Sequence, residues 1–416
     1  MEIRGDKKTK QIQAVTRQEE ASLGGYWIPF DLTREILVSL PSKSLMRFRC
    51  VSKQWASITS DPDFIYSFTK QSTSSSSTTC LSMLNFQKHD KLLFLSFRAQ
   101  QKNDHNLFSE THVEKYRLTL QKRDRYAPNF QFQSVHGLIS FHYFDHVVLW
   151  NPTIRQYVTF HKPGNPELGI QVLTKSYLGY DPIGNTYKLL SMTYGSIDAD
   201  PRVLTLGAGE SWRHVKDYPN RFLSSKGLCI NGILFIIVKN YEIHRKEIMS
   251  FDVRTEQFKI IQTHTCMRCP CIEVETNPSL VSYKGKLAWL ISESAFYKLW
   301  ILEDTEKEEW SCQDFHIPSP LEVPSTVKGN YFLSDVTEDG EFIYVSVSWQ
   351  DKEIYVSYYD PKRKTNRRIK IIEDFDDDFW LRKGSACPHE WEFLGTFPNH
   401  IENLLPVNKI TCSPSL

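Results

Sequence analysis

The residues with the clearest potential for metal chemistry lie between His264 and Cys271. In the segment His264-Thr-Cys266-Met-Arg-Cys269-Pro-Cys271, one imidazole and three thiols stand close together. A structural zinc site needs four ligands in a tetrahedron, and these usually come from two separated pairs. A single proline divides Cys269 from Cys271 and no second CxxC pair follows, so we interpret the segment as a loop of free thiols. We expect no metal and no cofactor.

A second group of side chains with a possible function is a run of basic residues in the last quarter of the chain. It consists of Lys362, Arg363, Lys364, Arg367, Arg368 and Lys370. Such a run could serve nuclear import or bind an acidic target. Carboxylates from Glu373 to Asp378 follow at once and cancel its charge at short range. We therefore interpret the run as a solvated turn between two strands.

Catalytic motifs are missing from the sequence. It contains no GxSxG, no glycine-rich phosphate loop and no HExxH, and its histidines and carboxylates are scattered without a recognisable spacing. The chain has 50 basic and 49 acidic residues, a net charge of +1, so no global field attracts it to nucleic acid or to a membrane surface. We expect a protein that is not an enzyme, with a partner that must be sought locally.

The cellular compartment follows from three further features. The first 25 residues lack the apolar region of a secretory signal. Apolar stretches such as Ile233–Val238 are far shorter than the roughly 20 residues of a membrane helix. Nine cysteines at irregular spacing do not form a disulfide framework. We expect an intracellular protein of the cytoplasm and/or the nucleus, with no membrane partner.

Most of the chain predicts β-structure. Stretches such as Phe342–Trp349 (FIYVSVSW) alternate with the period of a half-buried strand. Glycines that precede strands recur about every 50 residues at Gly232, Gly285 and Gly340, and Gly137 precedes Gly232 by about twice that distance. This spacing is typical of kelch-like blades, which bury their faces only against one another. We predict a large antiparallel β domain, a kelch-like β-propeller, although other strand-turn-strand proteins also scatter glycines in this way.

A short helical block precedes the β-rich part. Residues 28–64 predict three helices, with Pro41 ending the first and Asp61-Pro62 ending the third. A unit of fewer than about 40 residues cannot build a core that stabilises it alone. We therefore expect part of its apolar surface to dock on another molecule.

This block resembles the F-box motif. The elements of the motif stand in their usual order as Ile28-Pro29, Asp31-Leu32, Glu35-Ile36-Leu37, Leu40-Pro41, Lys43-Ser44-Leu45, Arg47-Phe48-Arg49-Cys50-Val51, Lys53-Gln54-Trp55 and Asp61-Pro62-Asp63-Phe64. Two positions depart from the pattern: Ile28 replaces a commoner leucine, and Ser52 stands where a cysteine is frequent. The resemblance implies docking on the Skp-type adaptor of a cullin-RING ubiquitin ligase.

The adaptor-binding residues that the resemblance implies are Ile28, Pro29, Leu32, Ile36, Leu37, Leu45, Val51 and Trp55. Three other apolar residues of the block, Leu40, Phe48 and Ile58, are expected to pack the helices together instead.

The resemblance extends into the β-rich part. The stretches Ser134-Val135-His136-Gly137-Leu138-Ile139, Trp150-Asn151-Pro152-Thr153 and Leu178-Gly179-Tyr180-Asp181-Pro182 are similar to the plant F-box-associated domain. Such domains are taken to recruit target proteins, so the resemblance implies a target-holding domain. The target and the substrate-binding residues are unknown.

The expected organisation is a disordered arm (1–25), an F-box (26–70), a linker with a Ser/Thr run (71–90), an F-box-associated β-propeller-like domain (91–400) and a tail (401–416). The expected function is the substrate-recognition subunit of a Skp-cullin-F-box ubiquitin ligase. The abundant aromatic residues keep an alternative open, a glycan or small-ligand binding module without ligase output. A third hypothesis, an enzyme on a propeller scaffold with metal at Cys266 to Cys271, has the least support.

Overall fold

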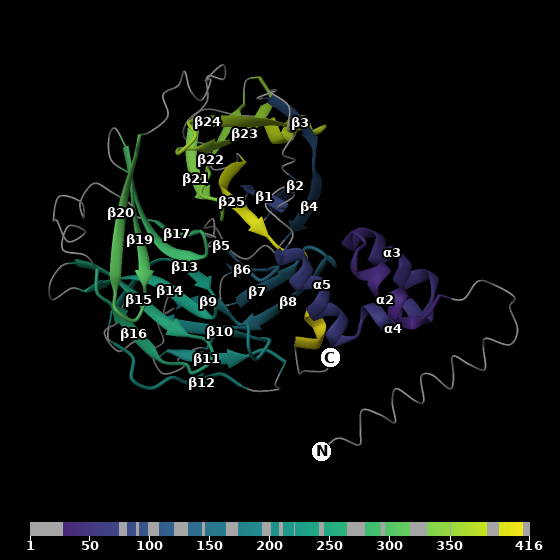
Figure 1. Cartoon of the computed structure of the whole chain (residues 1–416), viewed down its shortest axis with the longest axis horizontal. Coiled ribbons are helices and arrows are strands. Elements are labelled where there is room, and N and C mark those ends of the chain that lie inside the picture. Colours follow the sequence, from purple (N-terminus) through teal and green to yellow (C-terminus); the bar gives the residue numbers. More distant parts are fainter. Residues whose placement is uncertain are drawn as a thin grey trace, which may run out of the picture. The chain divides into compact units, whose positions relative to one another are not determined.

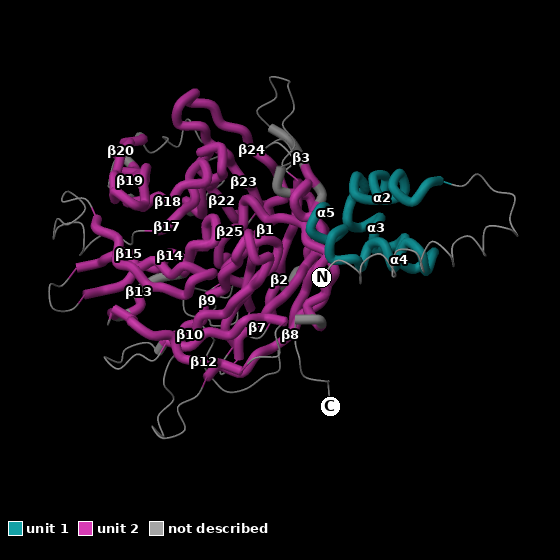
Figure 2. Tube along the Cα trace, turned by 60° about the horizontal axis from the view of Figure 1, so that its bottom comes forward, with its two compact units in different colours: residues 1–68 teal, residues 69–416 magenta. Residues whose placement is uncertain are grey.

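The computed structural model describes residues 28–74, 81–88, 91–98, 108–119, 132–143, 146–163, 174–193, 201–207, 211–219, 221–240, 245–263, 279–292, 296–316, 331–349, 351–380 and 391–410. The chain divides into two compact units, residues 1–68 and 69–416, which Figure 2 shows in separate colours. Within the described ranges, no helix is both long enough and apolar enough to cross a membrane.

The first unit is helical, with one helix more than the sequence predicts. Its helices are α2 (Phe30–Val38), α3 (Ser42–Val51), α4 (Lys53–Thr59) and the start of α5 (Pro62–Ser74). The expectation that Asp61-Pro62 ends a helix is wrong. Asp61 Oδ1 accepts hydrogen bonds from the backbone N–H groups of Asp63 (3.0 Å) and Phe64 (3.1 Å), and Pro62 occupies the first helical position. This dipeptide therefore begins α5, as a capping carboxylate followed by proline often does.

The second unit is a six-bladed antiparallel β-propeller, which confirms the predicted fold class (Figure 1). Blade 1 contains β25 (Glu392–His400), β1 (Leu81–Lys88), β2 (Lys91–Arg98) and β4 (Glu114–Thr119). Blade 2 contains β5 (Phe132–Val135), β6 (Leu138–Tyr143), β7 (His146–Asn151) and β8 (Gln156–His161). Blade 3 contains β9 (Thr174–Asp181), β10 (Thr186–Thr193), β11 (Arg202–Thr205) and β12 (Arg213–His214).

The other three blades complete the ring. Blade 4 contains β13 (Phe222–Ile230), β14 (Ile233–Asn240), β15 (Arg245–Asp252) and β16 (Phe258–Ile261). Blade 5 contains β17 (Ser279–Tyr283), β18 (Lys286–Ser292), β19 (Phe296–Asp304) and β20 (Glu309–His316). Blade 6 contains β21 (Tyr331–Val336), β22 (Phe342–Ser348), β23 (Glu353–Asp360), β24 (Thr365–Ile372) and a fifth strand, β3 (Phe108–His112).

The ring closes because each innermost strand neighbours the next. Contacts run from β5 to β9, β13, β17, β21, β25 and back to β5. Six hydrophobic clusters lie between successive blades, so each face of a blade is buried against its neighbour. The spacing from Gly137 to Gly232 is double because blade 3, which lies between these two glycines, joins its first two strands by the Asp181–Thr186 turn instead.

The two ends of the propeller sequence meet in blade 1. The last strand, β25, pairs antiparallel with the first, β1, and takes the innermost position. Because β1 begins at Leu81, the expected linker over 71–90 is wrong at both ends: α5 runs to Ser74, and the β domain starts ten residues before the predicted residue 91. The polar side chains of β1, including Asn85 and Gln87, hide the strand from a hydrophobicity pattern although the structure buries them.

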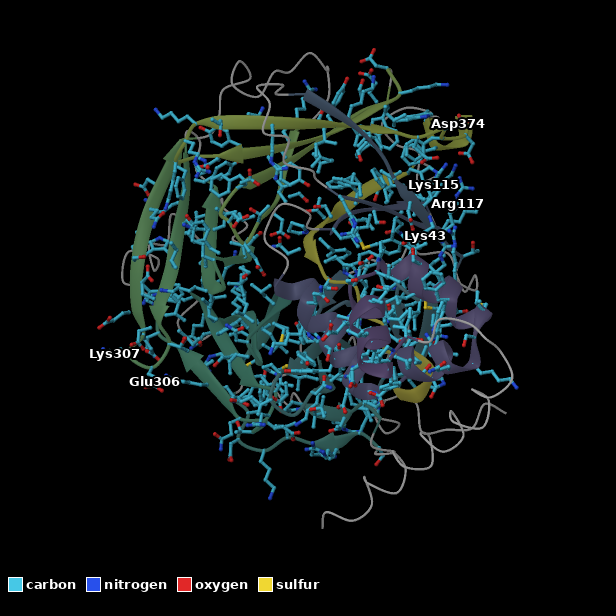
Figure 3. The ribbon with its side chains drawn as sticks, turned by 45° about the vertical axis from the view of Figure 1, so that its right-hand side comes forward. Lys43, Lys115, Arg117, Glu306, Lys307 and Asp374 are labelled. Atoms are coloured by element: carbon cyan, nitrogen blue, oxygen red, sulfur yellow. The ribbon has the colours of Figure 1, made fainter. Side chains whose placement is uncertain are left out.

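A second connection joins blades 6 and 1 at the outer edge. Residues 108–119 run through both sheets: β3 pairs parallel with β24 of blade 6, and after Val113 the chain continues as β4, which pairs with β2 of blade 1. Figure 3 shows Lys115 and Arg117 of β4 beside Asp374, which follows β24. Lys115 donates to the Asp374 carbonyl (2.9 Å) and pairs with Glu373 (2.7 Å). These contacts tie β4 of blade 1 to the segment that follows β24 of blade 6.

The residues after β25 belong to the propeller, so the expected tail over 401–416 is wrong for its described part. Asn151 of blade 2 donates from Nδ2 to the carbonyls of Asn403 and Leu405, both at 2.9 Å. Asn403 in turn donates from Nδ2 to the His136 carbonyl and to the Tyr187 hydroxyl of blade 3, again at 2.9 Å. The C-terminal segment thus fastens blade 2 to blade 3 after β25 has closed blade 1.

Apolar burial reinforces this fastening. Leu404 is buried, and Val407, in the short 3₁₀ helix η5 (Val407–Ile410), belongs to the cluster between blades 2 and 3. Burial lowers the pKa of His136 to about 4, so its ring is neutral where it stacks on Tyr180.

Three non-glycine residues with left-handed backbone angles, called struts below, contact a neighbouring blade: Glu256, Glu308 and Arg155. In the β15–β16 turn, Asp252 Oδ1 accepts from the N–H groups of Arg254 and Thr255, both at 2.8 Å, and Glu256 follows with φ 61°. From this position the Glu256 carboxylate reaches back to blade 3, where Lys188 donates to it at 2.6 Å and Arg213 also pairs with it.

The same device recurs in two other turns. Glu308 (φ 57°) of blade 5 pairs with Lys259 of blade 4 at 2.9 Å. Arg155 (φ 57°) of blade 2 lies over the Tyr116 ring of blade 1. The cost of the left-handed backbone, about 1 kcal/mol per residue, is offset by an inter-blade contact in each case.

Gly137→Ala should destabilise the propeller more than Gly285→Ala. Both glycines follow a first strand and have positive φ, 85° and 74°. A Cβ at Gly137 would lie 2.6 Å from Asn403 Cβ and 2.7 Å from the Ile401 carbonyl, whereas nothing lies within 4 Å of one at Gly285. We expect the control to lose about 1 kcal/mol from backbone strain and Gly137→Ala to lose a further 1–3 kcal/mol or so. Thermal unfolding measures both, and equal losses would contradict the C-terminal fastening.

Glu256→Gln should lower the free energy of unfolding at neutral pH by about 1 kcal/mol, after allowance for partial solvent screening. Burial raises the pKa of Glu256, but hydrogen bonds from Arg213 and Lys188 outweigh it and hold the pKa below its usual 4.5. Since the folded-state pKa is the lower one, the stabilisation is complete above the unfolded pKa and is lost as pH falls through the folded pKa.

The difference in the free energy of unfolding between wild type and Glu256→Gln should therefore shrink below about pH 4.5. Denaturant unfolding at a series of pH values measures it, with Glu309→Gln, an exposed residue of β20, as the control that should show little effect. A pH-independent difference would rule out the ion pairs as its cause.

Candidate partner-binding surface

Exposed apolar side chains gather in the helical unit. In the part of the chain that the structure describes, eight large hydrophobic residues are exposed, and six of them belong to residues 28–66. They are Ile28 (51%), Phe30 (45%), Leu32 (50%), Ile36 (49%), Val51 (72%) and Tyr66 (44%). The other two, Tyr157 and Ile183, lie on the propeller. Such a concentration on so small a unit makes it a candidate surface for binding a partner.

Helix α2 is apolar on two sides. Leu32 and Ile36 are one helical turn apart and both face solvent, whereas Leu37 is 2% exposed. Its start is fixed by Pro29, whose carbonyl accepts from the Thr33 N–H (2.9 Å) and from the Thr33 hydroxyl (3.1 Å). The buried side needs only a few residues, so the exposed stripe is not required to hold the helix within this unit.

Helices α3 and α4 support that surface from within. Leu45 is fully buried and Ile58 is 5% exposed. The Phe48 ring meets the Trp55 ring edge to face, with centroids 4.9 Å apart, and so joins α3 to α4. Arg49 of α3 also donates to the hydroxyl of Ser60, the residue that follows α4, at 2.6 Å. The expectation that Phe48 and Ile58 pack internally agrees with these contacts.

The eight residues implied as adaptor-binding therefore separate into three groups. Ile28, Pro29, Leu32, Ile36 and Val51 are exposed, Trp55 is half-buried against Phe48, and Leu37 and Leu45 are buried. The structure places Leu37 and Leu45 in the interior of the helical unit, and their contact with an adaptor stays a prediction. Whether the exposed residues meet an adaptor stays a prediction.

Sequence reasoning missed Phe30 on this surface. It is the first residue of α2, precedes Leu32 by two positions and is 45% exposed. The signal was available in the unbroken apolar run Ile28-Pro29-Phe30, but the motif elements quoted above skip Phe30.

The other chemical candidates of the sequence do not form a site in the described residues. The His264–Cys271 segment lies outside those residues, and no group of three or more His, Cys, Asp or Glu within them is arranged to hold a metal ion. In the basic run, Lys362, Arg363 and Lys364 occupy the exposed turn between β23 and β24. Arg367 pairs with Glu341 at 2.6 Å. The run is thus a turn followed by a strand whose charges take part in the fold.

The tryptophans of the propeller serve mainly to join blades. Trp150, Trp289 and Trp300 are buried in clusters between blades. Trp212, near the start of β12, donates from Nε1 to the His161 carbonyl of blade 2, and Trp310 donates in the same way to the Gln262 carbonyl of blade 4, both at 2.9 Å. These five tryptophans are therefore engaged between blades, whereas Tyr157 keeps 61% of its surface exposed.

Each of the two units matches a known protein family. The family model described as the F-box domain matches residues 27–67, and the model described as the F-box associated beta propeller domain matches residues 81–401. The Arabidopsis thaliana protein named "Putative F-box protein At4g21240" is 36% identical over 418 residues, covering 96% of this chain and 94% of that protein. "F-box protein At5g18160" of the same plant is 34% identical over 382 residues and 91% of each chain.

Two neighbouring residues of α2 test whether Leu37 packs inside the helical unit while Ile36 lies on its surface. Leu37→Ala should destabilise the helical unit by about 2–4 kcal/mol, because it empties a buried position. Ile36→Ala should change stability by less than about 0.5 kcal/mol, because the side chain is half exposed. Hydrogen exchange of residues 28–68 in the full chain measures both variants, and faster exchange in Ile36→Ala than in Leu37→Ala would reverse the assignment.

Proposed function

The chain belongs to the family of F-box proteins with an F-box associated beta-propeller domain, and on this premise we propose that it is the substrate-recognition subunit of a Skp-cullin-F-box ubiquitin ligase. In this proposal the helical unit docks on the Skp-type adaptor, and the propeller holds the target protein.

The exposed apolar surface of the helical unit carries the proposal. Leu32 and Ile36 leave about half of their surface in water, and Val51 leaves 72%. Covering the rest of such a side chain contributes about 1 kcal/mol, so several together supply a useful share of a stable complex. A protein that kept this surface bare would gain nothing from it and would be prone to aggregate.

The contribution to ligation is proximity. A target held on the propeller and a conjugating enzyme held through the adaptor and the cullin share one complex, which raises the effective concentration of a target lysine at the reactive thioester. This role requires no catalytic residue on the chain, in keeping with a family of non-catalytic adaptors.

We propose that the protein performs this function in the cytoplasm or the nucleus. Cys50, Cys229 and Cys312 are free thiols, as expected in a reducing compartment. The alternative of a glycan-binding module gains no support from Trp150, Trp289 and Trp300, which are buried between blades.

The double variant Pro29→Ala with Leu32→Asp should abolish co-purification with a Skp-type adaptor. A carboxylate at position 32 would have to be desolvated in an apolar contact, at a cost of several kcal/mol. Both residues are exposed, so the fold should survive, which circular dichroism and thermal unfolding of the full chain verify.

Ile183→Asp provides the matched control. It places the same charge at another exposed aliphatic residue, 74% exposed on the β9–β10 turn of the propeller, and should leave adaptor binding unchanged. Undiminished adaptor binding by the folded double variant would refute the proposed docking surface.

A further inference from the structure

The outermost strand of blade 2 differs from the other outermost strands in its charge. Strand β8 reads Gln-Tyr-Val-Thr-Phe-His and holds no Asp, Glu, Lys or Arg. Each of the other outermost strands that the structure describes carries at least one such residue: Glu114, Lys115 and Arg117 in β4, Arg213 in β12, Lys259 in β16, Glu309 and Asp314 in β20, and Glu110 in β3. Charged residues on an edge strand prevent another chain from pairing with it. Blade 2 lacks this protection.

The backbone of β8 presents hydrogen-bonding groups to the outside of the sheet. The His161 carbonyl accepts from Trp212 Nε1, a donor that lies outside the sheet of blade 2, so this carbonyl points away from β7. In an antiparallel ladder every second residue has the same orientation. The backbone N–H and C=O groups of Tyr157 and Thr159 therefore point outward too, between the β7–β8 turn and the end that Trp212 caps.

The outward groups of Tyr157 and Thr159 remain open in the described structure. No backbone hydrogen bond outside the ladder involves residues 156–160, and their side chains have no further partner either. The helix η5 contacts β8, but Val407 of η5 packs with Val158 and Phe160, which point to the face opposite Tyr157 and Thr159. Among the described strands none pairs with this edge, and Tyr157 is 61% exposed.

Blade 6 shows that this propeller accepts an added strand at an outer edge. Its fourth strand, β24, pairs in parallel with β3, which comes from a different part of the chain, over the register Arg368↔Phe108 to Ile372↔His112. In blade 2, no strand that the structure describes is added at the corresponding edge. The two blades thus differ in occupancy of the same structural position.

We propose that β8 is a peptide-docking site, at which an extended, uncharged segment of a target protein adds a fifth strand to blade 2. Main-chain hydrogen bonds to Tyr157 and Thr159 give the affinity, and the exposed Tyr157 ring selects an apolar or aromatic side chain opposite it. The biological meaning rests on the proposed function, since the bound segment would be the target's recognition signal, but the binding site is a property of the propeller alone.

The test uses a random decapeptide library displayed on phage and selected against the purified full chain, with no adaptor present. Selected peptides are synthesised and titrated calorimetrically against wild type, Thr159→Lys and Thr119→Lys. Thr159 lies on the uncharged edge, whereas Thr119 is an exposed threonine on β4, which already carries charge. We expect Thr159→Lys to weaken binding by about tenfold or more and Thr119→Lys to leave it within about twofold.

Two further measurements identify strand addition itself. Two series of peptides are N-methylated, one at the odd-numbered and one at the even-numbered amides. One series should lose binding and the other should keep it, because only one set of amides faces β8. Hydrogen exchange of residues 156–161 should slow when peptide is bound.

The proposal would be overturned if the library yielded no binders or if Thr159→Lys left peptide binding unchanged. It would also be overturned if neither N-methyl series affected binding. A concentration-dependent dimer of the chain that Thr159→Lys abolishes would also overturn it, since a second copy would then occupy the edge. The double variant Pro29→Ala with Leu32→Asp separates the two proposals, because it should leave peptide binding intact even where it abolishes adaptor binding.

Discussion

Closure of the ring between blades 6 and 1 is the constraint on which the propeller depends. A blade buries both faces only if it has two neighbours, so a ring left open would expose the faces of two blades. The chain closes it at the inner edge with β25 on β1 and at the outer edge with β3 on β24. Between them lies a cluster that combines Leu84 and Phe86 from the start of the domain with Phe375 and Trp391 from its end. Each of these pairings joins segments about 250 residues or more apart, and each carries a large loop-closure entropy that the burial must offset.

Closure also explains where polar residues can be buried. Asn403 and Asn151 use their amide groups to satisfy backbone carbonyls and hydroxyls of three different segments, and both are nearly inaccessible to water. A buried amide is tolerated because its hydrogen bonds are made within the fold. The struts at Glu256 and Glu308 apply the same logic at the rim, where a strained backbone conformation directs a carboxylate to the neighbouring blade.

The two surfaces proposed for binding use different physics. The helical unit presents side chains, Leu32 and Ile36 above all, whose contribution comes from removal of apolar area from water. The edge of blade 2 presents backbone groups, whose pairing depends on direction and register rather than on area. A surface of the first kind suits one constant partner, since many side chains must fit at once. One of the second kind tolerates varied sequences, which suits a receptor that reads short segments.

The sequence by itself determined the helical motif, the class of the β domain and the family, because these depend on local order: apolar spacing around Leu32 and Ile36, period-two strands such as Phe342–Trp349, and glycines at the first turn of four blades. It could not show that Leu37 is buried while its neighbour Ile36 is exposed. Nor could it identify β1 as a strand. Both features depend on what packs against these residues. Asp61-Pro62 was ambiguous for the same reason, because an Asp-Pro pair can end one helix or begin the next. Only the tertiary structure decided the number of blades, the role of residues 401–410 and the bare edge of β8. Those features arise from contacts between residues far apart in the chain, and a local pattern contains no record of them.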